Sequence, residues 1–185
     1  MVTKEERILD AAWQLIMRHG FRKVTMSDIA DAAGMSRPSL YASFANKESI
    51  VDTFTSRKSD LYDIETEMQL RDRESLAGRL AAVFEIWIVE PFASVIDLDN
   101  GLDLLTNSEI YAPAGTSDFY ARFERHLAEI LRSEFATTSS MTAEDTAHIL
   151  MMATKGLKAT TQTLPELRRM IDGLITMTTA TARCG

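Results

Sequence analysis

The sequence predicts an all-α protein, and three features of its 185 residues support that prediction. Glycine and proline, which interrupt helices, are few, with eight and four residues. Apolar residues make up 45% of the chain and recur at intervals of three and four, as on one face of a helix. Residues that cap helix N-termini stand directly before several of these periodic stretches.

The first periodic stretch predicts a helix over residues 3–19. Thr3 and Glu6 have the spacing of a capping box, in which each side chain satisfies a backbone N–H group at the helix start. Gly20 is a helix stop signal, and Phe21 is expected to make a hydrophobic contact after it. The inward stripe consists of Ile8, Leu9, Ala12, Trp13, Leu15 and Ile16.

The next stretch, from Thr25 to Lys47, predicts two short helices across a tight turn and the start of a third helix. Thr25 and Asp28 again have capping-box spacing. Gly34 stands where a backbone with positive φ would end the first short helix, and Ser36 is expected to cap the second. The pattern is that of a helix-turn-helix.

The second short helix separates its apolar residues from its polar ones. Leu40 and Phe44, four residues apart, are expected to point inward, and Pro38 fits the first turn because its missing N–H costs nothing there. The outer side carries Arg37, Ser39, Tyr41 and Ser43. Guanidinium, hydroxyl and phenol groups of this kind bond base edges and phosphates.

This stretch resembles the DNA-binding motif of TetR-family transcriptional regulators. The matching residues are Gly20, Thr25, Ile29-Ala30, Ala33-Gly34-Met35-Ser36, Leu40-Tyr41, Phe44 and Lys47-Glu48, all at family spacing. Met35 replaces a commoner valine, Pro38-Ser39 a frequent Gly-Thr or Gly-Ala, and Ala42-Ser43 stand where an aromatic residue or histidine is common. These departures affect sequence preference more than class. The resemblance is specific over residues 3–61 and is one of architecture beyond them.

The resemblance implies a three-helix helix-turn-helix DNA-binding domain over residues 1–47, with its signature extending to residue 62. A long helix would join it to a helical ligand-binding and dimerisation domain over residues 48–185. The implied function is that of a sequence-specific transcriptional regulator. A homodimeric repressor, released from a pseudo-palindromic double-stranded DNA operator by a small-molecule effector of unknown identity, is the expected form.

Eight residues are expected to contact DNA: Thr25, Ser27, Ser36, Arg37, Pro38, Ser39, Tyr41 and Lys47. Arg37 is the expected base reader, because its fork can bond O6 and N7 of guanine together; a phosphate contact is the alternative. Tyr41 is expected on phosphate, with a structural phenol as the alternative. Lys47, at the start of the following helix, is the expected phosphate clamp.

The rest of the chain predicts further helices separated by short polar segments. These helices are expected over residues 46–70, 76–90, 93–96, 101–106, 117–135, 142–162 and 163 to near the end, with a turn at 71–75, a loop at 112–115 and a linker at 136–140. The apolar side of the first consists of Ile50, Val51, Phe54, Leu61, Ile64 and Met68.

The resemblance implies that the last two helices form a four-helix bundle with a second copy of the chain. The expected participants are Ile149, Leu150, Leu157, Leu174 and Met177, and packing within one chain is the alternative. A small-molecule pocket is also implied, and its expected lining is Phe84, Trp87, Ile88, Phe92, Phe119, Phe123, Met151 and Met152. Core packing is the alternative for these residues.

The net charge of −7 is unevenly distributed. Residues 1–58 carry nine Lys and Arg against seven Asp and Glu, a net charge of +2, whereas residues 59–185 carry eleven against twenty, a net charge of −9. A DNA-binding N-terminal part therefore stays compatible with an acidic chain. Arg22 and Lys23 are either phosphate contacts or solvated charges.

Other classes of function find little support. No stretch is long and apolar enough to cross a membrane, no secretion signal precedes the first helix, and Cys184 is the single cysteine, which favours the cytoplasm. The three histidines are scattered, and His126 is expected on an exposed helical face, so no metal site or cofactor is predicted. No catalytic motif is present. The rival interpretation is a helical small-molecule-binding protein or enzyme whose helix-turn-helix is purely structural.

Overall fold

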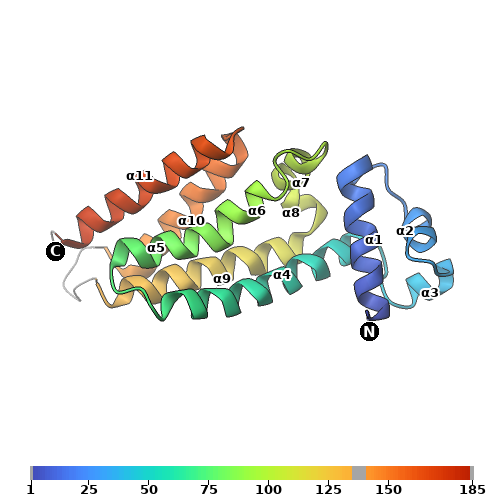
Figure 1. Cartoon of the computed structure of the whole chain (residues 1–185), viewed down its shortest axis with the longest axis horizontal. Helices are drawn as coiled ribbons and strands as arrows, with labels where there is room; N and C mark the ends of the chain where they lie inside the picture. Colours follow the sequence, from blue (N-terminus) through green and yellow to red (C-terminus); the bar gives the residue numbers. More distant parts are fainter. Residues whose placement is uncertain (1, 135–140, 184–185) are drawn as a thin grey trace. The chain divides into compact units, whose positions relative to one another are not determined.

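The computed structural model describes residues 2–134 and 141–183, and its regular structure is helical throughout these ranges (Figure 1). The all-α prediction is confirmed. The helices are α1 (Lys4–His19), α2 (Met26–Ala32), α3 (Arg37–Tyr41), α4 (Lys47–Leu70), α5 (Leu76–Phe84), α6 (Glu90–Ala93), α7 (Gly101–Thr106), α8 (Ser108–Tyr111), α9 (Pro113–Arg132), α10 (Ala143–Thr160) and α11 (Leu164–Arg183), with a π-helix, η1 (Glu85–Val89), between α5 and α6. The linker predicted at 136–140 and Cys184 lie outside the described residues.

The chain divides into two compact units, and each is assembled from two separate stretches of sequence. The first unit contains Met1–Lys58 and Asp97–Phe119, and the second contains Ser59–Ile96 and Tyr120–Gly185. Helices α4 and α9 therefore contribute residues to both units. The functional domains expected at 1–47 and 48–185 stay a prediction, because the units are defined by packing and not by function.

Most helix boundaries in the first unit follow from the capping residues that the sequence indicates. Thr3 caps α1 and Thr25 caps α2, each in a complete capping box. The side chain of Ser36 caps α3, and Asn46 Oδ1 accepts the N–H of Ser49 at 2.7 Å at the start of α4. Gly20 ends α1 with a φ of 85°. The helix starts predicted from these caps are confirmed.

Two predicted boundaries are wrong. The loop expected at 112–115 is the beginning of α9, because Pro113 occupies the first helical position, where a proline loses no hydrogen bond. The N–H of Gly115 is accepted by Asp52 Oδ1 at 2.7 Å, which fixes this helix start against α4. The short helix expected at 93–96 lies earlier, as α6, with Pro91 in its first turn.

The apolar side predicted for α4 is only partly buried. Ile50 and Val51 are buried, whereas Leu61, Ile64 and Met68 are 57%, 58% and 61% exposed. In the second half of the helix, the fully buried positions are taken by the hydroxyl residues Ser59 and Thr66. Thr66 Oγ1 accepts a 2.8 Å hydrogen bond from Trp87 Nε1, so this buried position holds the acceptor that the indole N–H needs.

The second unit has an aromatic core. Phe84, Trp87, Phe92 and Phe123 are at most 1% exposed, and the rings of Phe84 and Phe123 meet edge to face at 5.4 Å. Trp87 lies in η1, where the N–H of Glu90 donates to the carbonyl of Glu85. Pro91 follows and has no N–H group, so a regular helical turn could not continue unchanged there.

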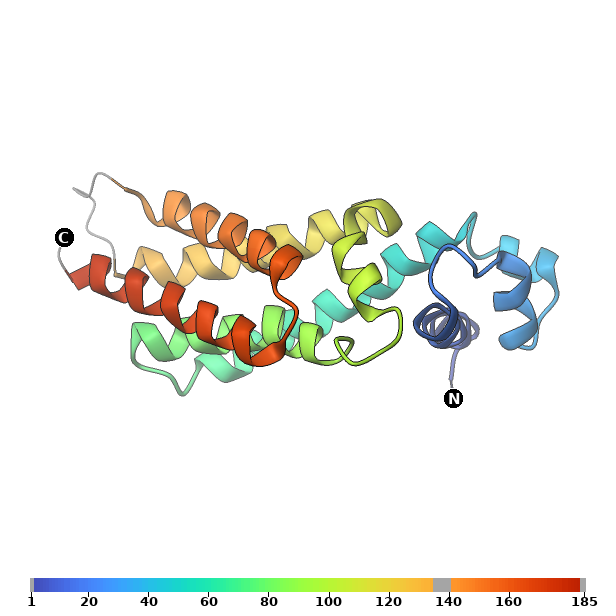
Figure 2. The same cartoon turned by 90° about the horizontal axis from the view of Figure 1, so that it is seen from above.

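Helices α10 and α11 lie side by side and run in opposite directions (Figure 2). Thr142 begins α10 with a capping box to Asp145, as predicted. Leu150, Leu167 and Ile171 bury the inner faces of the two helices. Among the described residues, no helix is both long enough and apolar enough to span a membrane.

Candidate nucleic-acid interface

Helices α2 and α3 are joined by a tight turn that glycine permits. Gly34 has a φ of 66°, as the sequence predicts, and the N–H of Met35 reaches back to the carbonyl of Ala30 at 3.0 Å. Leu40 is fully buried and Phe44 is 7% exposed, so α3 is anchored by its inner side. The short helix thus presents a fixed outer surface.

The outer surface of α3 carries the predicted contact residues. Arg37 and Pro38 are exposed, and Tyr41 is 54% exposed. Arg37 Nη2 donates to the hydroxyl of Ser27 on α2, which joins the two residues expected to meet DNA from different helices. The guanidinium is therefore exposed and oriented before any partner arrives, and it keeps further N–H donors for a planar acceptor.

Two of the predicted contact hydroxyls already have structural partners. Thr25 Oγ1 donates to Asp28 Oδ2 at 2.7 Å and accepts the N–H of Asp28, and Ser36 Oγ accepts the N–H of Ser39 at 3.3 Å. Hydrogen bonds from the Thr25 hydroxyl and backbone hold the pKa of Asp28 below its usual range. Both hydroxyls therefore serve first as helix caps.

One residue that helps to position α3 was not identified from the sequence. Lys4 Nζ, at the start of α1, donates to the carbonyl of Ser39 at 2.9 Å. The two residues are 35 positions apart, so no local pattern reveals the contact. Its consequence is that Ser39 contributes its backbone to the fold and leaves its hydroxyl for other partners.

Lys47 occupies a different position from that of a simple exposed phosphate clamp. It is half-buried, and its Nζ donates to the carbonyls of Phe21 at 2.7 Å and Val24 at 3.2 Å. The same ammonium lies 4.3 Å from the centre of the Phe21 ring. Two of its three N–H donors therefore hold the turn between α1 and α2, and one remains for a phosphate.

The residues predicted to line a ligand pocket are mostly core residues. Those at most 1% exposed are Phe84, Trp87, Ile88, Phe92 and Phe123, and those at 7% are Phe119 and Met151. Phe119 belongs to the first unit and the others to the second. Met152 is 52% exposed and does not share their burial, because successive residues on a helix point about 100° apart.

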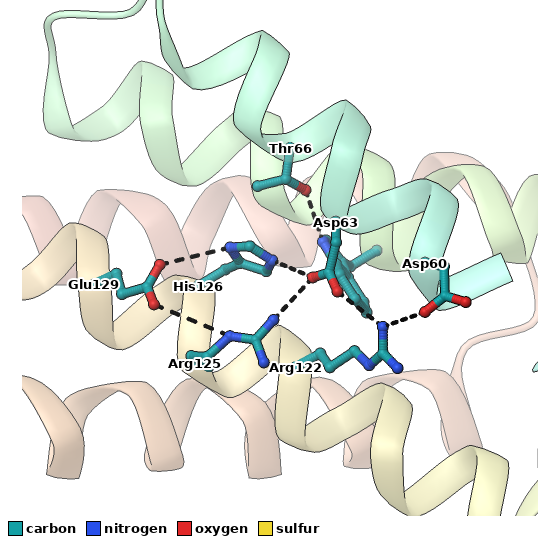
Figure 3. A network of polar contacts seen from close by, with 8 residues as sticks. Asp60, Asp63, Thr66, Arg122, Arg125, His126 and Glu129 are labelled. Atoms are coloured by element: carbon teal, nitrogen blue, oxygen red, sulfur yellow. Dashed lines mark hydrogen bonds and ion pairs between the residues drawn. The ribbon is translucent and has the colours of Figure 1, made fainter. Parts of the chain in front are cut away.

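A polar network in the second unit links α4 to α9 (Figure 3). Asp63 accepts hydrogen bonds from Arg122 at 2.9 Å and Arg125 at 3.0 Å, and its Oδ1 lies 2.6 Å from His126 Nε2. Burial alone would raise the pKa of Asp63, but the bonds from His126 and Arg122 outweigh it and hold that pKa below its usual range.

The prediction that His126 lies on an exposed face is wrong. Its side chain is 7% exposed and lies against the Trp87 ring, with the ring centres 5.5 Å apart. Its sequence neighbours are charged, but Asp63 from another helix pairs with the imidazole and allows it to be buried.

Sequence reasoning also missed Lys158, whose ammonium lies 5.4 Å from the centre of the Tyr120 ring. Burial lowers the pKa of Lys158 to about 8.

The residues predicted for a dimer interface differ in their exposure. Ile149 and Met177 are 54% and 61% exposed, whereas Leu150 is 4% exposed and packs within the chain. Leu157 and Leu174 are half-buried. Met152 on α10 is 52% exposed, so α10 and α11 each carry exposed apolar side chains. Within the described ranges, no three His, Cys, Asp or Glu side chains come together in a group that could hold a metal ion.

Comparison with known proteins assigns this helix-turn-helix to a family. Residues 8–53 match the family model described as bacterial regulatory proteins, tetR family. Over this stretch the chain is similar to the TetR family. Among curated relatives, the HTH-type transcriptional repressor ComR of Escherichia coli is 29% identical over 112 residues, which cover 60% of this chain and 53% of ComR. The repressor KstR2 of Rhodococcus jostii is 47% identical over 49 residues, 26% of this chain and 24% of KstR2.

The match to these curated relatives covers about half of their length or less. Solved structures extend the likeness of fold over nearly the whole chain. The fatty acid degradation regulator FadR from Bacillus halodurans has a TM-score of 0.73 at 17% identity and covers 93% of this chain and 94% of that one. Thermus thermophilus FadR, solved in complex with lauroyl-CoA, has a TM-score of 0.62 at 20% identity and covers 92% of this chain and 93% of that one.

Proposed function

We propose that the chain is a sequence-specific DNA-binding transcriptional regulator. The observation that carries the proposal is the outer surface of α3, where the exposed Arg37 guanidinium is held by Ser27 above an apolar anchor. A guanidinium fixed in this way can bond O6 and N7 of guanine in the major groove. Tyr41 is exposed beside it and supplies a hydroxyl for phosphate.

The other predicted contact residues take supporting roles in the proposal. Pro38 and the hydroxyl of Ser39 complete the groove-facing side of α3. Thr25, Ser36 and Lys47 hold the local backbone and meet phosphate with whatever hydrogen-bonding capacity remains. Affinity then depends on few charges, in keeping with the net charge of +2 over residues 1–58, so two heads acting together are required.

We propose a homodimer formed through the outer side of α10 and α11. Ile149, Met152 and Met177 are all more than half exposed in the single chain, and burial against a second copy would remove this apolar surface from water. A two-fold dimer presents two copies of α3. The operator is then a pseudo-palindrome whose half-sites lie about 34–36 Å apart, or a multiple of that spacing.

The regulator is proposed to be a repressor that a small molecule releases from DNA. ComR and KstR2 are named as repressors, and Thermus thermophilus FadR was solved with lauroyl-CoA. The aromatic and methionine residues of the second unit supply the apolar surroundings that such an effector needs. An effector that binds one arrangement of α4 more tightly than another would shift the population of heads competent for DNA.

The experiment that tests the proposal is selection of bound duplexes from a random DNA pool, with the oligomeric state measured in the same buffer. A palindromic motif bound by a dimer, with an affinity that falls steeply as salt rises, is the expected result. No enriched motif at low salt would overturn the proposal. The interpretation would then pass to a helical small-molecule-binding protein or enzyme with a structural helix-turn-helix.

A further inference from the structure

The turn between α1 and α2, residues 20–24, leads directly into the helix-turn-helix. Phe21 and Val24 are buried, at 4% and 3% exposure, while Arg22 and Lys23 between them are exposed. Thr25, which caps α2, follows at once. The direction in which this turn leaves α1 therefore sets where α2 begins.

One side of this turn is held from the start of α4. Lys47 Nζ donates to the carbonyls of Phe21 and Val24 and lies over one face of the Phe21 ring, 4.3 Å from its centre. A cation over an aromatic face is attracted by the electrons of the ring. This contact lies within the sequence of the helix-turn-helix itself.

The other contact comes from far along the chain. Tyr111, at the end of α8 and 3% exposed, stacks its ring on Phe21 with the centres 4.1 Å apart and the planes 19° from parallel. Its hydroxyl accepts a 3.1 Å hydrogen bond from Arg22 Nε and donates to Asp103 Oδ2 on α7 at 3.1 Å. The side chain of Tyr111 thus contacts one buried residue of the turn, Phe21, and one exposed residue, Arg22.

A second contact ties the same segment to the end of α1. Asn100, just before α7, donates from Nδ2 to the carbonyl of Met17 at 2.9 Å. Its side-chain oxygen lies 2.9 Å from the place where a Cβ on Gly20 would stand. Residues 100–111 therefore hold the end of α1 and the first residues of the turn.

The geometry points to Tyr111 as a positioning residue for DNA binding. It acts through Phe21 and Arg22, and it fixes the turn from which α2 and α3 project. The inference rests on the proposed function, and it extends the DNA-binding machinery to a residue outside residues 1–47. Arg22 is assigned to this hydroxyl and not to a phosphate.

The test compares the affinity of Tyr111→Phe for the selected duplex with that of the wild-type chain. The variant keeps the stacked ring and loses only the hydroxyl between Arg22 and Asp103. A lost hydrogen bond of about 1 kcal/mol corresponds to about five-fold weaker affinity. The selected motif and the salt dependence are expected to stay unchanged, because Tyr111 touches neither base nor phosphate. Tyr62→Phe, a hydroxyl loss in the second unit, is the matched control and should bind as wild type does.

A merely structural role is separated from positioning by a double-mutant cycle. Arg22→Met keeps the side-chain length and removes the donor, so its effect on affinity and that of Tyr111→Phe should not add in the double variant. If Tyr111→Phe folds poorly, Asp103→Asn weakens the same hydroxyl contact from an exposed position and should reduce affinity about two-fold, as loss of part of one hydrogen bond does.

Four outcomes would count against the inference. Wild-type affinity of folded Tyr111→Phe, or additive effects in the cycle, would overturn it while leaving the proposed function intact. A smaller salt dependence for Arg22→Met would assign Arg22 to phosphate and overturn it in the same way. A wild-type chain that enriches no motif would overturn the proposed function, and the inference with it.

Discussion

The helix-turn-helix and the α4–α9 pair use polar residues in opposite ways. In the helix-turn-helix, the hydroxyls of Thr25 and Ser36 find partners three residues away, and Arg37 finds Ser27 ten residues away. Between α4 and α9, Asp63 is bound by three side chains of α9 about sixty residues along the chain. Local pairing shapes a surface and leaves polar groups facing outward, whereas long-range pairing uses the polar groups to hold helices together.

The largest effect is expected on the oligomeric state, when the exposed apolar residues of α10 and α11 are replaced. Ile149→Glu with Met177→Glu should convert the proposed dimer to monomers, because each carboxylate would have to be buried without a partner; the cost is about 3 kcal/mol or more per interface. Sedimentation at several concentrations measures this. Ile64→Glu on α4, at 58% exposure, is the matched control and should leave the dimer intact. A charged pair at 149 and 177 that still dimerises would place the interface elsewhere.

A smaller effect, a loss of stability, is expected when the polar network around Asp63 is weakened. Asp63→Asn should lower the free energy of unfolding by about 2–3 kcal/mol at neutral pH, because the hydrogen bonds of a carboxylate to Arg122 and His126 are weakened. Glu129→Gln is the control: that carboxylate is 53% exposed and lies 3.9–4.0 Å from its partners, so its loss should cost under about 0.5 kcal/mol.

The polar network around Asp63 also predicts how the free energy of unfolding changes with pH. The pKa of Asp63 is lower in the folded chain than in the unfolded one. Its contribution is therefore fully present above the ordinary Asp value of about 4 and is lost as the pH falls through the lower folded-state value. Chemical denaturation at pH 7 and at pH 3 should show the gap between wild type and Asp63→Asn narrowing in acid. A gap of constant size would contradict the pairing.

In the first unit, the expected change is in DNA preference. Arg37→Ala should relax the choice of base at one position in each half-site, by about 1–3 kcal/mol of discrimination. Ser27→Ala should give a weaker form of the same change, because it releases the guanidinium without removing it. Repeated duplex selection measures both. Arg73→Ala removes one positive charge in the second unit and should leave the motif intact; an unaltered motif for Arg37→Ala would show that Arg37 does not read bases.

The smallest effect concerns a single cap. Thr25→Val keeps the shape of the side chain and removes the hydroxyl that accepts the N–H of Asp28, which should cost about 1 kcal/mol of unfolding free energy. Thr53→Val removes a hydroxyl inside α4 that bonds only a carbonyl of its own helix, and it should cost less. Equal losses in urea denaturation would mean that the cap is not the source of the stability.

The contrast between local and long-range contacts also explains which features of the structure could be predicted from the sequence. The helix starts at Thr3, Thr25 and Ser36 were predictable, because a cap and its partner lie three residues apart. The partner of His126 was not, since Asp63 meets it only after two distant helices pack. The contacts of Lys4 and Tyr111 were missed for the same reason.

The outer side of α4 was misjudged for a related cause. A periodic pattern shows that a helix has an apolar side, but not which neighbour covers each turn. Trp87 requires a hydrogen-bond acceptor, and the hydroxyl of Thr66 supplies it at a buried position. The predicted apolar residues beside it are left exposed.

The discontinuous first unit has a consequence for building hybrid regulators. Exchanging residues 1–58 for those of a relative would separate the incoming turn from residues 97–119, which belong to the same unit. The transplanted head would then meet a Tyr111 and an Asn100 suited to another sequence. A transplant that carries both stretches keeps these contacts, so the natural exchangeable module is a pair of segments and not an N-terminal fragment.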